Sequence, residues 1–502
     1  MMCQSVSDSH TMETETVVTD VDELPEHARA LFLSVLEASD RLWDRAERLL
    51  ANPANDDGHP VRASTRYALG LLVRDDPGDR ERAAATIEQV LEYQYTSDPS
   101  AVYYGTWARD PADFGPMSEP TEWTDYDPNW REFVGTTLAV LLDTQRDRLP
   151  PELRERMARA IDIAAAGTLE RDVSPGYTNI ALMRAYLLHW TADHFGRDGL
   201  RRTAEAYART IHELYRDGET FCEFNSPTYA GVSLNALGQW VSTDRTDQLN
   251  RLGNEMEAGL WEQLATFYHA DLGILCGPYS RAYGMDTRRS LADYYIWMAA
   301  RGQRQLDYPE SHHTDIPGNY CSALFAVVLR GWRRCPDGAR DAFTSFNGPR
   351  NVERRVACVD QEVTATAWLG EGAMCGGFAV AETAAIDGRE QLHTGTFHWD
   401  CGDSLIGWGR IRTPDGTVPT VTARDGTLAI RQPSGDPVVI EVSAPDIDAT
   451  DLETTAWRLP GRTVTVEDGG ATCVVKATAS NTLRLHYGPV ANGEVEVRLS
   501  FE

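Results

Sequence analysis

Residues 217–229 read DGETFCEFNSPTY, an Asp-Gly turn and an aromatic-rich segment that lead into an apolar helical run. Ser226 is a good helix N-cap, and Pro227 has the fixed φ that suits a first helical turn. The pattern predicts a conformationally fixed loop that places Tyr229 at a helix N-terminus, where its phenol is available for chemistry. The structural alternative is a helix entry in which Ser226 caps and Tyr229 packs against its neighbours.

This loop lies inside a long region of helical patterns, from about residue 25 to about residue 345. In runs such as STRYALGLLV and TNIALMRAYLLHWTADHF, apolar residues recur at three-and-four spacing, and Pro, Gly, Asn or Asp separates one run from the next. Roughly ten to twelve helices without strands between them suit paired helices that curl into an incomplete or closed α/α toroid. Because no strict repeat is visible, a toroid is favoured over a solenoid.

The pattern changes at residue 351. Segments such as PVVIEVSA, RTVTVEDG and EVEVRLSF are short, β-branched and alternating, and Asp-Gly, Pro-Ser-Gly and Asn-Gly turns separate such segments. They predict an antiparallel β-sandwich. The predicted fold class is therefore multidomain α+β. A disordered, acidic segment at 1–24 precedes an α/α toroid catalytic domain at 25–345 and a β-sandwich domain at 351–502.

The composition restricts the partners. Over 502 residues the formal net charge is -29, and Lys476 is the one lysine among 47 Lys and Arg residues, which is typical of a halophilic surface. Nucleic acid is disfavoured as a partner, because phosphate binding needs clustered Lys and Arg. We find no signal-peptide pattern, no apolar run long enough to span a membrane, and no CxxC pair among the nine cysteines. We expect a soluble, cytoplasmic protein with reduced thiols and no membrane partner, and the sequence leaves its oligomeric state open.

Three stretches together resemble a known family. DGETFCEFNSPTY is similar to the Asp-Gly, Glu-x-Ser-Pro-x-Tyr motif of the heparinase II/III-like polysaccharide lyases, with Glu223 one residue further from the serine than in that motif. SPGYTNIALM at 174–183 and FHWDCGDSLIGWG at 397–409 are similar to two further motifs, in the family's order. The resemblance implies a helical toroid followed by a β-sandwich, with Asn179, Tyr229 and His398 as catalytic residues. Ile180 stands where the family often has a histidine.

The activity that this resemblance implies is β-elimination at a uronic acid of a poly- or oligosaccharide. The proton on C5 is weakly acidic until the charge of the adjacent carboxylate is offset, a role for Asn179 with Arg281 as a second contact. Tyr229 would deliver or remove a proton, and His398 would be the other proton carrier. The expected partner is therefore an acidic saccharide.

Further substrate-binding candidates lie on the segment PYSRAYGMDTRRS and beside Tyr229. The guanidinium group of Arg281 could hold a carboxylate bidentately. The alternative is an ion-paired helix start with Asp286 as its cap. The other candidates near these positions are Tyr279, Tyr283, Glu223 and Asn225.

The long loop TWARDPADFGPMSEPTEWTDYDPNW supplies two aromatic candidates, Trp123 and Trp130. Long structured loops in compact domains are usually functional, and a flat indole face matches the C–H face of a pyranose ring. The alternative is that these tryptophans pack between helices.

Two other site chemistries stay open. Paired carboxylates could form a glycosidase site on the same helical scaffold, or the chain could bind carbohydrate without catalysis. The carboxylates available for such a pair are Glu223, Asp125, Asp127 and Asp286.

A divalent metal near His398 and Asp400, with His393 and Cys401 close in sequence, is a further alternative. Their spacing matches no closed zinc site, so we expect no cofactor.

Overall fold

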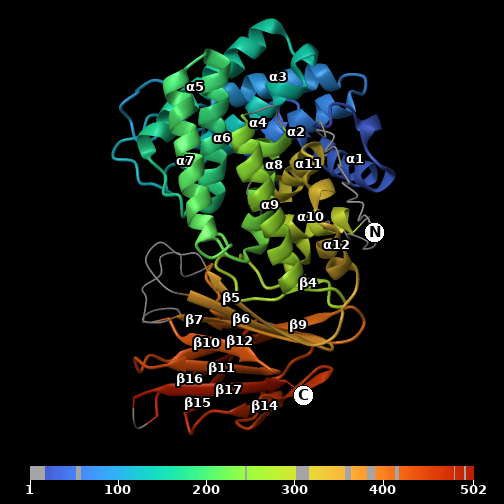
Figure 1. The fold of residues 1–502 in the computed structure, drawn as a ribbon, viewed down its shortest axis with the longest axis vertical. Coiled ribbons are helices and arrows are strands. Elements are labelled where there is room, and N and C mark those ends of the chain that lie inside the picture. Colours follow the sequence, from blue (N-terminus) through green and yellow to red (C-terminus); the bar gives the residue numbers. More distant parts are fainter. Residues whose placement is uncertain are drawn as a thin grey trace, which may run out of the picture.

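The computed structural model describes residues 17–52, 58–242, 246–300, 316–356, 363–380, 391–412, 418–479, 481–490 and 493–501. Its N-terminal part is rich in helices, and its C-terminal part consists of antiparallel sheets (Figure 1). The change from three-and-four spacing to alternation thus marks the change from helix to strand, as the sequence predicts.

The described helices lie N-terminal to the two large sheets, and each begins or ends near the Pro, Gly, Asn and Asp residues that separate the apolar runs. The helices are α1 (Glu26–Asp40), α2 (Val61–Arg74), α3 (Asp79–Glu92), α4 (Trp130–Thr144), α5 (Pro151–Arg171), α6 (Thr178–Phe195), α7 (Asp198–Arg216), α8 (Pro227–Ser242), α9 (Asp247–Phe267), α10 (Leu291–Ala299), α11 (Ile316–Val328) and α12 (Asp337–Thr344).

Consecutive helices pack in pairs: α2 with α3, α4 with α5, α6 with α7, and α8 with α9. A second set of contacts runs through α2, α4, α6, α8, α10 and α11 and returns from α11 to α2. Helix α6 is buried from Thr178 to Ala192, whereas α7 buries one face, as expected for an inner and an outer helix. This cycle of contacts favours the predicted toroid, which stays a prediction.

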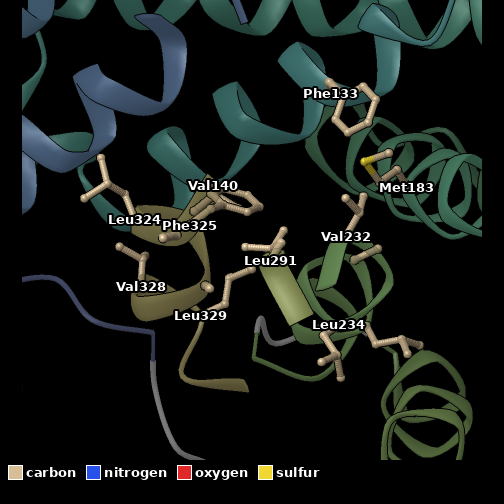
Figure 2. Packing of buried hydrophobic residues seen from close by; sticks show 14 of the residues in the cluster. Phe133, Val140, Met183, Val232, Leu234, Leu291, Leu324, Phe325, Val328 and Leu329 are labelled. Atoms are coloured by element: carbon tan, nitrogen blue, oxygen red, sulfur yellow. The ribbon is translucent and has the colours of Figure 1, made fainter. Parts of the chain in front are cut away.

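The helical core is densely packed where α8, α10 and α11 meet. Figure 2 shows the side chains of Val232, Leu291 and Phe325 gathered there. A Cβ atom added at Gly231 would lie 2.5 Å from Cγ of Leu291, so glycine is required for this close approach of α8 to α10.

Two large sheets form the C-terminal part, with every described strand pair antiparallel. One runs in the order β15-β16-β12-β9-β8-β7-β6-β5 and the other in the order β10-β11-β17-β14-β13. Their strands are β5 (Arg350–Val356), β6 (Val363–Gly370), β7 (Ala373–Val380), β8 (Gly395–Asp400), β9 (Ile406–Arg412), β10 (Thr420–Arg424), β11 (Thr427–Gln432), β12 (Val438–Ser443), β13 (Ala456–Leu459), β14 (Arg462–Glu467), β15 (Cys473–Ala479), β16 (Thr482–Tyr487) and β17 (Val495–Phe501). Two short hairpins, β1 (Trp43–Asp44) with β2 (Leu49–Leu50) and β3 (Tyr268–His269) with β4 (Ile274–Leu275), lie within the helical part.

The eight-stranded sheet has a core on each face. Phe397 and Trp399 of β8 belong to the cluster shared with the five-stranded sheet. On the other face, Phe224 and Phe267 of the helical part pack with residues of β6 and β7. Because side chains alternate along a strand, His398 points to the face that meets the helical part. One face of the eight-stranded sheet therefore packs against the loops of the helical part. The predicted sandwich stays a prediction.

The N-terminal boundary differs from the prediction. Residues 1–16 lie outside the described residues. Residues 17–24 are packed: Val18 is buried and its N–H donates to the carbonyl of Val328. The apolar residues of this segment, Val17, Val18, Val21 and Leu24, belong to the helical core. Asp20 and Glu23 form a capping box around a short 3-10 turn, Val21–Glu23. No described helix has the length and apolar composition needed to cross a membrane.

A buried ion pair in the helical part gives a test of this packing. Nε and Nη2 of Arg334 donate to the two carboxylate oxygens of Glu257 at 2.7 and 3.1 Å, and the glutamate side chain is 2% exposed. Arg334→Ala leaves that carboxylate buried without its cation and should lower the free energy of unfolding by about 3 kcal/mol. Chemical denaturation measures the change.

The matched control is Arg458→Ala, which removes the exposed partner of Glu453. Such a surface pair contributes no more than about 1 kcal/mol. Equal losses in the two variants would contradict the view that Glu257 and Arg334 hold α9 against the turn at 331–334.

Candidate active site

The loop before α8 is tied to a second loop at 276–283. Asn225 has a left-handed φ of 49°, and its Nδ2 donates to the carbonyls of Cys276 and Pro278 at 2.7 and 2.9 Å. The Ser226 hydroxyl donates to the carbonyl of Arg281 at 2.6 Å and accepts the N–H of Tyr229 at 3.2 Å. Ser226 is therefore the predicted helix cap, and it also fixes the backbone that carries Arg281 next to Tyr229.

The Tyr229 hydroxyl is the centre of this arrangement. It accepts a hydrogen bond from Nη2 of Arg281 at 3.0 Å and lies 2.6 Å from the hydroxyl of Tyr283. The guanidinium carbon of Arg281 stands 3.9 Å from the centre of the Tyr229 ring. A cation thus contacts both the face and the oxygen of one phenol, which stabilises any negative charge that develops on that oxygen.

Glu223 gathers the other predicted groups. Its Oε2 accepts the backbone N–H of Asn179 at 2.8 Å and the Nδ2 of the same residue at 2.6 Å, while Oε1 accepts Nη1 of Arg281 at 2.5 Å. The Glu223 side chain is 7% exposed. Asn179, Glu223, Arg281 and Tyr229 therefore form one connected cluster, although they lie on three separate segments of the chain.

Burial sets the protonation of the central phenol. It raises the pKa of Tyr229 far above its usual value, the neighbouring Tyr283 raises it further, and the positive charge of Arg281 opposes both. Burial likewise raises the pKa of Tyr177, whose ring lies 5.5 Å from the guanidinium carbon of Arg281. Both phenols are thus protonated at neutral pH.

The long aromatic loop reaches this cluster through polar contacts. Nδ2 of Asn129 donates to the Tyr177 hydroxyl at 2.8 Å, and Oδ1 of Asn129 accepts Nη1 of Arg171 at 2.7 Å. The guanidinium carbon of Arg171 stands 5.8 Å from the Trp123 ring. Trp123 has a left-handed φ of 68° and is 50% exposed. A strained backbone that presents an indole to solvent is typical of functional loops.

Trp130 differs from Trp123. It opens α4, is buried in the helical core, and packs under the guanidinium of Arg62 at 5.4 Å. Trp130 therefore packs between helices, which was the alternative to sugar stacking, because it lies at the start of an inner helix and faces the core. Tyr283, in contrast, is 65% exposed and stands at the surface of the Tyr229 cluster.

Two further residues predicted to contact substrate are buried and therefore cannot do so. Tyr279 is fully buried, and its hydroxyl donates to the carbonyl of Leu275. Asn225 is fully buried, and its amide donates to the two carbonyls of the neighbouring loop. Both residues shape the loops that carry Arg281, and neither lies at the surface.

His398 is placed differently from Asn179 and Tyr229. It faces the helical part, but it is fully buried, and its Nε2 donates to the carbonyl of Met285 at 2.9 Å. Burial lowers its pKa to about 4. His393 behaves alike: its Nε2 donates to the carbonyl of Ala282 at 3.0 Å, and its pKa is lowered to about 4. Both histidines hold the 282–285 backbone against the sheet, and in the described chain no hydrogen bond joins His398 to Tyr229 or Asn179.

The remaining carboxylates have local partners. Asp286 caps a 3-10 turn by accepting the N–H of Arg288 and also binds that guanidinium group, as the alternative predicts. In the part of the chain that the structure describes, the carboxylate of Glu223 accepts three hydrogen bonds, so a glycosidase pair built on it gains no support. Within the described ranges, no three His, Cys, Asp or Glu side chains gather closely enough to hold a metal ion.

The structure adds a residue that sequence reasoning missed. Gln391 belongs to none of the motifs described above, yet its Oε1 accepts a hydrogen bond from Nε of Arg281 at 2.9 Å. The N–H of Ala282 also donates to the carbonyl of Gln391. No signal in the sequence indicates this contact, because the two residues are 110 positions apart.

Comparison with protein families gives a match over residues 29–327 to the family described as "Domain of unknown function (DUF8769)". The match covers more than half of the chain and includes Asn179, Glu223, Tyr229 and Arg281. The chain belongs to this family. No curated protein matches the sequence.

Among solved structures, the chain is similar to a chondroitin AC lyase from Streptomyces coelicolor A3 in complex with chondroitin sulphate, at 11% identity and a TM-score of 0.38, over 95% of this chain and 97% of that chain. A mutant of the heparan sulfate lyase HepC from Pedobacter heparinus follows at 8% identity and a TM-score of 0.31, over 88% and 76%. The endoglucanase CelQ from Clostridium thermocellum, complexed with cellotriose, has 11% identity and a TM-score of 0.26, over 95% and 92%. These likenesses are too weak to transfer an activity.

The burial of His398 predicts how stability depends on pH. The pKa of His398 falls from 6.5 to about 4 on folding. Between these two pH values, the imidazole is protonated in the unfolded chain and neutral in the folded chain. Its stabilising contribution is complete above pH 6.5 and is lost as the pH falls toward 4, by about 1.4 kcal/mol per pH unit. His398→Gln keeps a donor for the Met285 carbonyl and should reduce this slope by that amount, as measured by denaturation between pH 4 and 6.5.

His486→Gln is the control, because this histidine lies half-buried on β16, away from the 282–285 backbone. It should leave most of the slope in place. A slope that is unchanged in His398→Gln would show that folding does not shift the pKa of this imidazole.

Proposed function

We propose that this protein cleaves a uronic-acid-containing poly- or oligosaccharide by β-elimination, with Tyr229 as the residue that moves protons. One observation carries the proposal: the Tyr229 hydroxyl lies 3.0 Å from Nη2 of Arg281 and 2.6 Å from the hydroxyl of Tyr283. The first contact stabilises a phenolate, and the second supplies a route by which the phenol exchanges its proton with solvent, since Tyr283 is exposed.

The chemical step uses one oxygen twice. The Tyr229 phenolate takes the proton from C5 of the uronate, the C4–O4 bond breaks as the C4–C5 double bond forms, and Tyr229 returns the same proton to O4. The residue ends the reaction as it began, so no net proton is consumed. A phenol whose pKa is raised by burial gives a strong base, which suits a carbon acid as weak as C5–H.

The other predicted residues support this centre. Asn179 acts through Glu223. Glu223 accepts a hydrogen bond from Nη1 of Arg281, so that Nη2 can donate to the hydroxyl of Tyr229. His398 acts through the carbonyl of Met285, two residues after Tyr283. Trp123 and Tyr283, both exposed, are proposed to stack on sugar rings on either side of the reacting bond.

Tyr229→Phe tests the role of the phenol. The change removes one hydroxyl and keeps the ring that packs under Arg281, so the fold should persist while kcat falls by about a hundredfold or more with little change in KM. The measurement is the ultraviolet absorbance of the unsaturated product with a panel of uronate polymers and oligomers, together with a thermal melt.

Tyr295→Phe is the matched control, because the Tyr295 hydroxyl is buried and donates to Oδ1 of Asn235 at 2.7 Å. It should lower stability by about 1 kcal/mol and leave kcat unchanged. A folded Tyr229→Phe variant with wild-type kcat would remove Tyr229 from the mechanism and end the lyase proposal.

The raised pKa of Tyr229 also predicts the pH dependence of the rate. Below the pKa of a base, its active fraction rises tenfold per pH unit, so kcat/KM should rise steadily from neutral pH and show no plateau below about pH 10. A bell-shaped profile centred near pH 6 to 7 would instead indicate a histidine as the base.

A further inference from the structure

Glu223 occupies the donors that a substrate carboxylate would need. The family resemblance implies that Asn179 contacts a uronate carboxylate, with Arg281 as a second contact. The N–H groups of Asn179 and Nη1 of Arg281 instead all point to the two oxygens of this glutamate. The glutamate is nearly buried beside them. It therefore stands where the recognised carboxylate was expected.

The local charge follows from these contacts. Arg281 carries one positive charge and Glu223 one negative charge, and they form the ion pair at the centre. Among the described residues, the other side chains that contact this pair include Asn179, Gln391, Tyr229 and Tyr177, all uncharged at neutral pH. A free carboxylate that approached Tyr229 would meet an arginine already neutralised and a second carboxylate of the same sign.

We propose that Glu223 makes this site select a uronate whose carboxyl group is uncharged, as in a methyl-esterified uronic acid polymer. The inference rests on the proposed β-elimination and names its substrate class. An ester presents no charge to Glu223, and its carbonyl can still accept a hydrogen bond.

The chemistry of an ester fits a neutral centre. A proton alpha to an ester is more acidic than one alpha to a carboxylate, because its removal gives a singly charged enolate and not a dianion. The cation that a free uronate requires is then unnecessary. In this step the C5–H and C4–O4 bonds break, the C4–C5 double bond forms, the proton passes by way of Tyr229 to O4, and the ester stays intact.

The test uses each uronate polymer as a pair, the free acid and its methyl ester, with unsaturated product measured by absorbance. Assays in molar salt shorten the Debye length to about 3 Å, so the net charge of -29 cannot by itself produce a preference. Wild-type protein should cleave the ester with a kcat/KM about tenfold or more above that of the acid, since like charges side by side are strongly disfavoured.

Variants assign the preference to one side chain. Glu223→Gln removes the charge and should shift the ester-to-acid ratio toward the acid by about tenfold, whereas Glu223→Asp keeps the charge and should keep the ratio. Glu257→Gln, the same substitution in another buried glutamate–arginine pair, controls for general loss of stability and should leave the ratio unchanged.

The outcomes separate this inference from the function on which it rests. Cleavage of the free acid in preference to its ester would overturn the role of Glu223 and leave the lyase proposal standing. The same ratio in Glu223→Gln as in the wild type would also overturn it. Unsaturated product from neither form of any polymer would overturn both proposals.

Discussion

The ion pair between Glu223 and Arg281 is the contact on which the candidate site depends. It joins the loop before α8 to the loop at 276–283, and through Asn179 it reaches the start of α6. Taking two charges out of water is costly, and the cost is offset only when the remaining hydrogen-bonding groups are satisfied. Here Glu223 has three donors, and Arg281 also donates to Gln391 and Tyr229. Together with the hydrogen bonds of Asn225 and Ser226, the pair fixes the relative positions of these segments.

The sheet part contributes rigidity to this arrangement. The 282–285 backbone is held from below by His393 and His398, each with an imidazole nitrogen on a carbonyl, and by Gln391 on the N–H of Ala282. Phe224 packs between the helical part and the sheet in the same region. The loop that carries Arg281 is thus clamped between two cores. Residues of the C-terminal part therefore help to position Arg281 next to Tyr229, which lies on a helix of the N-terminal part.

The sequence predicted the elements better than their side-chain contacts, for physical reasons. Periodicity reports which face of an element is apolar, so the helical region, the strands and the cap at Ser226 could be read from local residues. It does not report which elements meet, and the contact of Gln391 with Arg281 had no local signal. Trp123 and Trp130 show the same limit, since both lie in one loop sequence. Trp130 starts an inner helix and packs in the core, whereas Trp123 lies on a strained backbone at the surface. Likewise, alternation on β8 sends His398 to the face that meets the helical part but cannot show that Met285 covers it.

Arg281 has two electrostatic roles that compete with each other. Its positive charge lowers the cost of a phenolate on Tyr229, yet the same charge attracts any carboxylate that comes within reach, and each carboxylate it binds weakens its effect on the phenol. In the structure, Glu223 accepts a hydrogen bond from Nη1 of Arg281 and is itself held by Asn179, while Nη2 lies 3.0 Å from the Tyr229 oxygen. Burial raises the pKa of the Tyr229 phenol, and the guanidinium group of Arg281, which lies against its ring, opposes that shift. A centre built in this way favours constant geometry over strong charge. Such a centre suits a reaction in which one oxygen must accept and return a proton without moving.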